Sequence, residues 1–248
     1  MTQRDAQPDL ARAAIGLLRV LDLTRLAEDD DETAVAEWSR RALAAPVHPA
    51  AVCVFRQFVP AVRRALGDTV RLATVANFPA GDDDPRGAAL ECEQAIDAGA
   101  DEVDVVLPWR ALKRGDEALC ADLVAACRDA CGDHTLKVIV ESGMLADSHC
   151  LQRAAEISIH AGADFLKTST GKTPVGATME AAGSLLDAIQ SSGRPVGFKA
   201  SGGIRTMADA LAFRDLVADR LGAEATGPER FRIGASGLHD ELMKALAE

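Results

Sequence analysis

Short apolar segments rich in β-branched residues alternate with longer amphipathic segments along the chain. Several short segments are nearly continuous apolar runs, as expected for parallel strands that are covered on both faces. Pro85, Gly99 and Gly162 stand where the amphipathic segments would begin or end as helices. The predicted strands are 18–23, 51–55, 69–75, 102–107, 135–140, 163–168, 195–199 and 230–234, and the clearest predicted helices are 85–99, 145–162 and 178–192.

Eight strands that alternate with helices predict an α/β fold of the (β/α)8 TIM-barrel type. The competing architecture is a doubly wound open sheet, which usually has fewer strands and often carries a Gly-rich turn after its first strand. Here the first strand leads into TRLAEDD (24–30), which contains no glycine. We therefore expect a single barrel domain over residues 1–248, with a short helix at about 8–17 before the first strand.

The overall charge narrows the classes of partner. The chain has 248 residues and a formal net charge of -11, so its surface should repel nucleic acid and anionic lipid, and we expect neither as a partner. The start MTQRDAQPDL is polar, and no run approaches the roughly 18 apolar residues of a membrane span. We expect a soluble, cytoplasmic protein with no membrane partner.

The cysteine pattern gives two alternatives. No cysteines form a CxxC pair, but Cys127 and Cys131 are four residues apart on a predicted helix. They could belong to a zinc or redox site, or be reduced cysteines that pack in the core, and the spacing favours packing. Tyrosine is absent, so no tyrosine can act as an acid or base.

Polar residues stand at the carboxyl ends of the predicted strands, where barrel enzymes build their active sites. Two lysines and an aspartate on separate strands would meet at one place. The strand-end residues are Asp22 and Thr24, Cys53, Asn77, Asp104, Glu141, Lys167, Lys199 and Gly234.

Lys167 ends a strand that should be buried. Burial and a second cation, Lys199, would both lower its pKa, and a neutral amine can attack a carbonyl to form a Schiff base. The alternative is a lysine that reaches solvent from the strand end. Asp104 and Asp22 are candidates either for acid–base chemistry or for structural ion pairs. The combination of Lys167, Lys199 and Asp104 favours chemistry.

Two glycine-containing segments follow the last two predicted strands. SGGIRT (201–206) precedes a predicted helix and GAS (234–236) follows the eighth strand, and free backbone N–H groups there could cradle a phosphate. The alternative is that these glycines only end strands. Lys172 could add a cation, but TSTGK lacks the spacing of a nucleotide-triphosphate loop, so we exclude that ligand.

Six segments resemble the deoxyribose-phosphate aldolase family, and the resemblance runs from about residue 15 to the end. It implies a class I lyase of deoxyribonucleotide and carbohydrate catabolism that needs no metal or cofactor. The expected reaction is reversible cleavage of 2-deoxy-D-ribose 5-phosphate to D-glyceraldehyde 3-phosphate and acetaldehyde, and the family suggests a homodimer. The segments are LDLTRL (21–26), ATVANFPAG (73–81), GADEVDVV (99–106), EISIHAGADFLKTSTG (156–171), GFKASGGIRT (197–206) and FRIGAS (231–236).

The resemblance also implies roles for individual residues. Lys167 would be the Schiff-base nucleophile, Lys199 would depress its pKa and relay protons, and Asp104 would be the acid–base partner. Asp22, Thr24, Cys53 and Thr168 would line the sugar end. The phosphate would be held by Gly171, Lys172, Gly202, Gly203, Arg205, Gly234 and Ser236.

The chain departs from the family pattern in two places. Ser236 is followed by Gly237 where some members carry a second serine, and the chain ends in ALAE without the terminal tyrosine of some members. These departures leave the preference for phosphorylated over free sugar and the proton donor to the enamine open. Two other functions remain: a phosphosugar-binding barrel isomerase or synthase without covalent catalysis, and a non-catalytic metabolite-binding protein.

Overall fold

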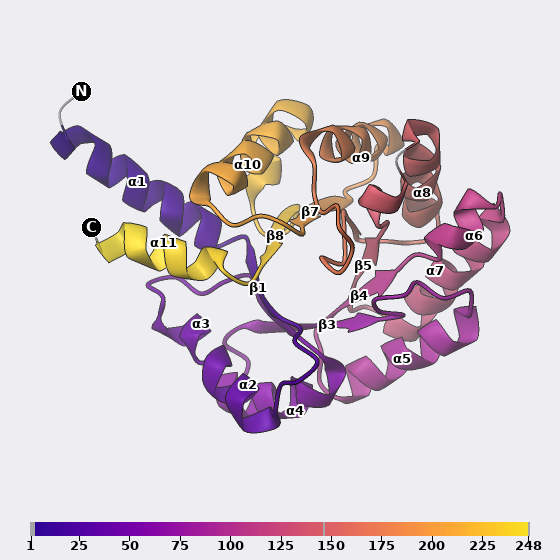
Figure 1. The fold of residues 1–248 in the computed structure, drawn as a ribbon, viewed down its shortest axis with the longest axis horizontal. Coiled ribbons are helices and arrows are strands. Elements are labelled where there is room, and N and C mark those ends of the chain that lie inside the picture. Colours follow the sequence, from indigo (N-terminus) through magenta and orange to yellow (C-terminus); the bar gives the residue numbers. More distant parts are fainter. Residues whose placement is uncertain (1–2, 146, 248) are drawn as a thin grey trace.

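A closed barrel of parallel strands, seen along its axis in Figure 1, forms the centre of the computed structural model. The structure describes residues 3–145 and 147–247, and the strands follow one another around the barrel in chain order. The predicted (β/α)8 TIM barrel is therefore confirmed. The strands are β1 Leu21–Arg25, β2 Ala51–Val54, β3 Arg71–Ala76, β4 Glu102–Val106, β5 Thr135–Ile139, β6 Phe165–Lys167, β7 Gly197–Ser201 and β8 Phe231–Ala235.

The helices form the outer layer of the barrel (Figure 1). Several begin at side-chain caps, as at Asp84, Thr178 and Thr206, each of which accepts a hydrogen bond from a backbone N–H of the first turn. The helices are α1 Gln3–Leu18, α2 Glu32–Ser39, α3 Arg41–Ala44, α4 Val59–Leu66, α5 Pro85–Asp97, α6 Trp109–Lys113, α7 Glu117–Cys131, α8 Ser148–His160, α9 Met179–Ser192, α10 Met207–Leu221 and α11 Leu238–Ala247.

The first strand lies further along the chain than its pattern predicts. The predicted strand 18–23 begins inside α1, whereas β1 starts at Leu21. Leu17 and Leu18 lie in α1 and are fully buried. Their apolar side chains therefore pack the helix and do not belong to a strand. The prediction that residues 1–248 form one domain stays a prediction, and residues 1, 2, 146 and 248 lie outside the described part.

The inside of the barrel is unusually polar. Residues facing the helices, such as Val52, Leu72 and Val103, belong to the main hydrophobic core. The inward positions of β4 to β8 instead carry charged side chains, and Gly234 leaves room for one of them: a Cβ on Gly234 would lie 3.0 Å from Lys199 Cε. Ala51, Cys53, Ala73 and Val75 form a separate small apolar cluster on β2 and β3.

The cysteines are free thiols that pack among helices and strands. Cys92, Cys127 and Cys131 are buried between α5 and α7, and burial raises the pKa of the Cys120 thiol to about 12. Within residues 3–145 and 147–247, no group of three or more His, Cys, Asp or Glu side chains is placed to hold a metal ion. The same residues include no helix that is both long and apolar enough to span a membrane.

Candidate active site

Lys167, Lys199 and Asp104 meet inside the barrel. Lys167 and Lys199 stand side by side in the register of β6 and β7, and Asp104 approaches from β4. The Nζ atoms of both lysines lie 2.7 Å from Asp104 Oδ2. Lys167 is 2% exposed and the other two are fully buried. The two lysines predicted from the sequence therefore share one oxygen of the predicted aspartate.

The two lysines have opposite pKa shifts. Burial lowers the pKa of Lys167, the positive charge of Lys199 lowers it further, and Asp104 only partly offsets these effects. Burial also disfavours the charged form of Lys199, but Asp104 and Asp22 outweigh it and the pKa of Lys199 is raised. Of the two amines, Lys167 is thus the one that loses its proton more readily.

The difference follows from the number of carboxylates at each lysine. Lys199 Nζ donates to two carboxylates, Asp22 Oδ2 at 2.5 Å and Asp104 Oδ2, whereas Lys167 Nζ donates to Asp104 Oδ2. Burial would raise the pKa of Asp104, but Lys137, Lys167 and Lys199 together hold it well below its usual range. Asp104 therefore stays ionised beside whichever lysines are charged.

Lys137, Glu102 and Arg232 extend this arrangement and were missed in the sequence. Lys137 Nζ lies 2.6 Å from Glu102 Oε2 and 2.8 Å from Asp104 Oδ1. Arg232 donates to Glu102 Oε1 at 2.9 Å and to Asp22 Oδ1 at 2.8 Å. We call these buried residues the charge network: Asp22, Glu102, Asp104, Lys137, Lys167, Lys199 and Arg232.

The residues predicted to line the sugar end lie at several depths. Asp22 is fully buried within the charge network, and Thr24 lies above it, donating to the Asp22 carbonyl. Cys53 is buried and interacts electrostatically with Lys167 and Lys199, and burial raises the pKa of its thiol to about 11. The Thr168 hydroxyl is buried, donates to the Ser201 carbonyl and accepts from the Ser201 N–H, so it ties β6 to β7.

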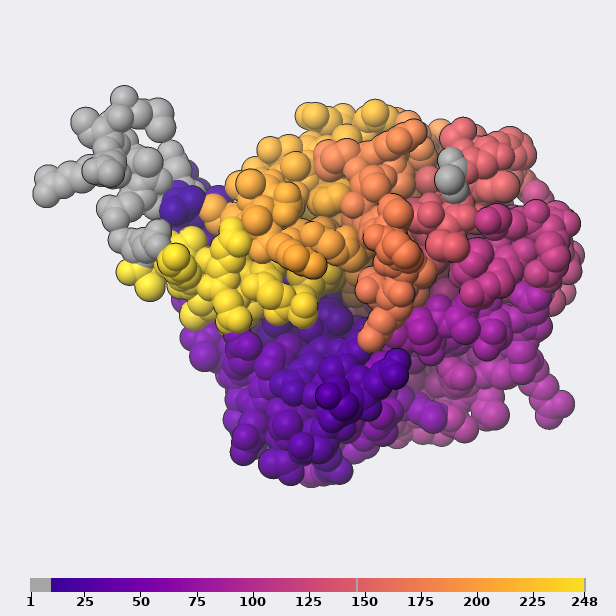
Figure 2. Space-filling view, in the orientation of Figure 1, coloured from indigo at the N-terminus to yellow at the C-terminus, as the bar shows by residue number. Residues whose placement is uncertain are grey.

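A cavity of about 980 Å³ lies over the ends of β1, β6, β7 and β8. In Figure 2 the orange segment after β6 extends toward the indigo segment after β1 at this end of the barrel. All seven predicted phosphate residues and Thr24 line the cavity. The predicted phosphate residues are Gly171, Lys172, Gly202, Gly203, Arg205, Gly234 and Ser236.

Left-handed backbone brings the phosphate candidates together. Gly171, Gly202 and Gly203 have φ of 76°, 92° and 85°, a region that residues with a Cβ rarely adopt. Glu141, whose own φ is 53°, fixes the turn after β6 by accepting hydrogen bonds from the N–H and hydroxyl of Thr170. Gly171, Gly202 and Gly203 thus line the cavity in turns of the kind whose backbone N–H groups bind anions.

Lys172 reaches across the mouth of the cavity. Its Nζ donates to the carbonyl of Leu26, in the loop after β1, at 2.8 Å. The exposed Arg205 is the second cation among the predicted phosphate residues. Helix α10 begins two residues later with a capping box between Thr206 and Asp209, and its N-terminal end adds positive potential on this side.

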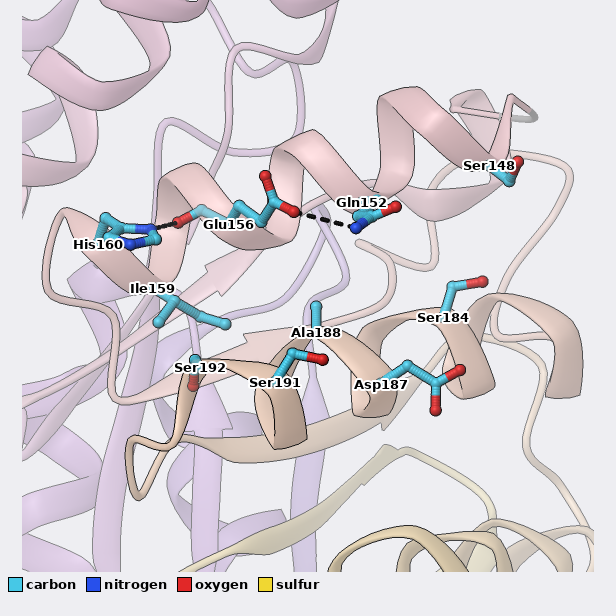
Figure 3. Close-up of a pocket in the computed structure, with 10 residues that line it drawn as sticks. All are labelled: Ser148, Gln152, Glu156, Ile159, His160, Ser184, Asp187, Ala188, Ser191 and Ser192. Atoms are coloured by element: carbon cyan, nitrogen blue, oxygen red, sulfur yellow. Dashed lines mark hydrogen bonds between the residues drawn. The ribbon is translucent and has the colours of Figure 1, made fainter.

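A second hollow lies between α8 and α9 on the outside of the barrel (Figure 3). Its wall contains none of the predicted site residues. Its polar groups are used by neighbours: Gln152 donates to Glu156, and Asp187 accepts from Arg220. We therefore place the functional site at the barrel mouth.

Buried lysines at the carboxyl ends of parallel barrel strands, close to a glycine-lined cavity, are the arrangement that an aldolase with an amine nucleophile requires. Comparison with family models agrees with this class. Residues 17–239 match the model described as DeoC/LacD family aldolase, and the chain belongs to that family of aldolases.

Solved structures give the same result. The apo form of a "putative deoxyribose-phosphate aldolase" from Toxoplasma gondii ME49 is 26% identical over 97% of this chain and 98% of its own, with a TM-score of 0.90. The tetrameric deoxyribose phosphate aldolase from Aeropyrum pernix is 25% identical over 100% and 97% of the two chains, with a TM-score of 0.72. This chain is similar to both along its whole length.

Proposed function

We propose that this aldolase cleaves 2-deoxy-D-ribose 5-phosphate reversibly to D-glyceraldehyde 3-phosphate and acetaldehyde through a Schiff base on Lys167. The observation that carries the proposal is the position of Lys167 beside Asp104 Oδ2 at the end of β6, whose following turn lines the cavity with Thr170, Gly171 and Lys172. The names of the similar structures from T. gondii and A. pernix support the choice of substrate.

The first half of the reaction forms an electron sink. The neutral Lys167 amine attacks the aldehyde carbon C1 of the open-chain sugar, and loss of water from the carbinolamine gives an iminium. Asp104 Oδ2 accepts hydrogen bonds from both lysines, and we assign to it the transfer of protons to and from the carbinolamine oxygen. The positive charge of Lys199 favours loss of the proton from Lys167, and the ionised Asp104 only partly offsets this effect.

The second half breaks the carbon–carbon bond. Removal of the C3 hydroxyl proton, through Asp104 and Lys199 or a water, lets the C2–C3 electrons move into the iminium. Glyceraldehyde 3-phosphate leaves, and an enamine remains on Lys167. Protonation of the enamine carbon restores the iminium, and water releases acetaldehyde and the free amine. The chain has no tyrosine, so the proton donor is sought among Asp104, Lys199 and water.

The phosphate is proposed to bind at the other end of the cavity. Backbone N–H groups of Gly202, Gly203 and Gly234, with the side chains of Lys172, Arg205 and Ser236, provide donors and positive charge. Thr24 lines the same cavity. The position after Ser236 is Gly237, so the turn after β8 offers one side-chain hydroxyl there.

The test combines product analysis with trapping. Deoxyribose 5-phosphate should yield glyceraldehyde 3-phosphate, and borohydride with substrate should leave a mass adduct on the peptide that contains Lys167. Lys167→Met should abolish both, with turnover reduced by at least about 10³-fold. Turnover with no trapped adduct would refute the Schiff base and favour a non-covalent barrel enzyme.

We further propose that the enzyme needs no metal, acts in the cytoplasm in deoxyribonucleotide and carbohydrate catabolism, and forms a homodimer. The A. pernix structure is described as a tetramer, so light scattering is the direct measurement of assembly. Turnover that persists with a chelator is the result expected for a mechanism in which the iminium polarises the substrate.

A further inference from the structure

The charge network contains more cations than carboxylates. Four positive side chains, Lys137, Lys167, Lys199 and Arg232, face the three carboxylates Asp22, Glu102 and Asp104. Arg71 adds a contact to Glu102 at 3.4 Å, but its side chain is 48% exposed and its charge is screened by water. Loss of one proton balances the buried charges, and the network must therefore determine which amine loses it.

Asp104 is held differently at its two oxygens. Oδ1 accepts from Lys137 at 2.8 Å, while Oδ2 accepts from Lys167 and Lys199 at 2.7 Å. Lys137 is itself held from the other side by Glu102, 2.6 Å away. Glu102, Lys137 and Asp104 thus form a chain that ends at the oxygen shared by the two lysines.

We propose that Lys137 is a positioning residue that acts on Lys167 through Asp104, and that Glu102 sets the strength of this action. Lys137 donates to Oδ1 and carries a fixed positive charge. Lys167 and Lys199 must therefore share Oδ2, which stabilises a charge on Lys167 only weakly. Glu102 competes with Asp104 for Lys137 and moderates the effect. The inference rests on the proposed Schiff-base role of Lys167.

The groups around Lys167 come from several strands, and each bears on this balance. Lys199 contacts the same Asp104 oxygen as Lys167, and Cys53 on β2 interacts with Lys167 electrostatically. Asp22 holds Lys199 from β1, and Arg232 holds Asp22 and Glu102 from β8. Phe165 lies under Arg232, with 5.4 Å from the guanidinium carbon to the ring centroid, and closes the network below.

Two isosteric changes should move the reactivity of Lys167 in opposite directions. Lys137→Met frees Oδ1, strengthens the hold of Asp104 on a charged Lys167, and should shift its reactivity about one unit to higher pH. In Glu102→Gln, Lys137 interacts with Asp104 alone of the two. Asp104 then stabilises a charged Lys167 less, so the reactivity of Lys167 should shift to lower pH. A purely structural role would reduce activity in both variants without opposite shifts.

The measurement does not need the proposed substrate. Acetaldehyde and cyanoborohydride ethylate a neutral amine, and mass spectrometry of the Lys167 peptide gives the extent of labelling at each pH. Lys113→Met, the same change at an exposed lysine, should leave the profile unchanged. If deoxyribose 5-phosphate is not cleaved but labelling shifts as expected, the proposed substrate is wrong and the positioning role stands.

Three results would overturn the proposal: no shift in either variant, shifts in the same direction, or a shift of Lys113→Met equal to that of Lys137→Met. If circular dichroism shows that Lys137→Met does not fold, Glu102→Gln alone tests the proposal. A labelling profile of Glu102→Gln that does not move, or that moves to higher pH, would then reject the role of Lys137.

Discussion

We propose two functions for Lys199, and one substitution can tell them apart by its effect on the pH profile. Its charge lowers the pKa of Lys167, and its contacts with Asp104 and Asp22 suit it to proton transfer. Its stem passes close to Gly234, where a side chain would collide with it. Each function depends on the ammonium, but only the first one changes the pH at which the free enzyme becomes active.

Lys199→Met should therefore change the position of the pH profile as well as the rate. Without this cation the pKa of Lys167 rises, the neutral fraction at a given pH falls, and the ascending limb of kcat/KM moves by about one unit or more to higher pH. Initial rates across the pH range provide the measurement. A lower rate with an unmoved limb would show that Lys199 transfers protons without tuning Lys167.

Among the elements, the loop from Gly171 to Thr178 is fixed by close backbone packing. A Cβ on Gly176 would lie 2.3 Å from the carbonyl oxygen of Gly202, and the N–H of Ala177 donates to that same oxygen. The loop after β6 therefore supports the glycine turn after β7. The position of the proposed phosphate turn depends on a glycine that does not line the cavity.

Gly176→Ala should push the Gly202 turn out of place and raise KM for the phosphorylated sugar about 10-fold or more, because small misplacements of binding groups are costly. The kcat/KM for free deoxyribose should change much less. Gly16→Ala is the control, since nothing lies within 4 Å of its Cβ. An equal loss with both sugars would assign the effect to general distortion of the site.

The sequence predicted the elements where pattern and packing agree. The ends of β4 and α9 lie within about one residue of the predicted ends. The run from Leu17 to Leu21 contains no glycine or proline to separate helix from strand, so the start of β1 was misplaced. Asp104 was recognised as a charge inside an apolar strand. The same rule applied to Lys137 in TLKVI and Arg232 in FRIGA would have identified the lower half of the charge network.

The contacts within the site could not be predicted in this way. That Thr168 uses its hydroxyl on Ser201, or that Glu141 holds Thr170, depends on the register of neighbouring strands and on one left-handed residue. Sequence alternation gives the face of a side chain but not its partner across the barrel. The sequence could predict that Lys167, Lys199 and Asp104 meet at one end of the barrel. It could not predict that both lysines contact the same oxygen of Asp104.

At the scale of the whole molecule, the two ends of the chain meet outside the barrel. Helices α1 and α11 pack together, and Figure 1 shows them side by side. His239 in the first turn of α11 is 3% exposed, and neither ring nitrogen has a hydrogen-bond partner among the described residues. Burial lowers the pKa of His239, and the charge of Arg41 adds to this effect.

Stability should therefore fall as the pH drops below about 6.5, where His239 gains a proton in the unfolded chain but not in the folded one. The slope is at most about 1.4 kcal/mol per pH unit, and it ends at the lower folded pKa. His239→Leu should flatten the free energy of unfolding between pH 6.5 and that limit, as urea titrations can show. The exposed His160→Leu should keep the slope of the parent protein.

The bond from Lys172 to the Leu26 carbonyl joins two loops that are 146 residues apart in the chain. One of these loops follows the strand that carries Asp22 and Thr24, and the other carries Gly171 and Lys172 of the proposed phosphate site. An anion that recruits Lys172 must either share this ammonium with Leu26 or release the loop. An anion at the phosphate end would then alter the loop that follows Asp22 and Thr24, so a sugar without phosphate should lose this effect as well as its anchor.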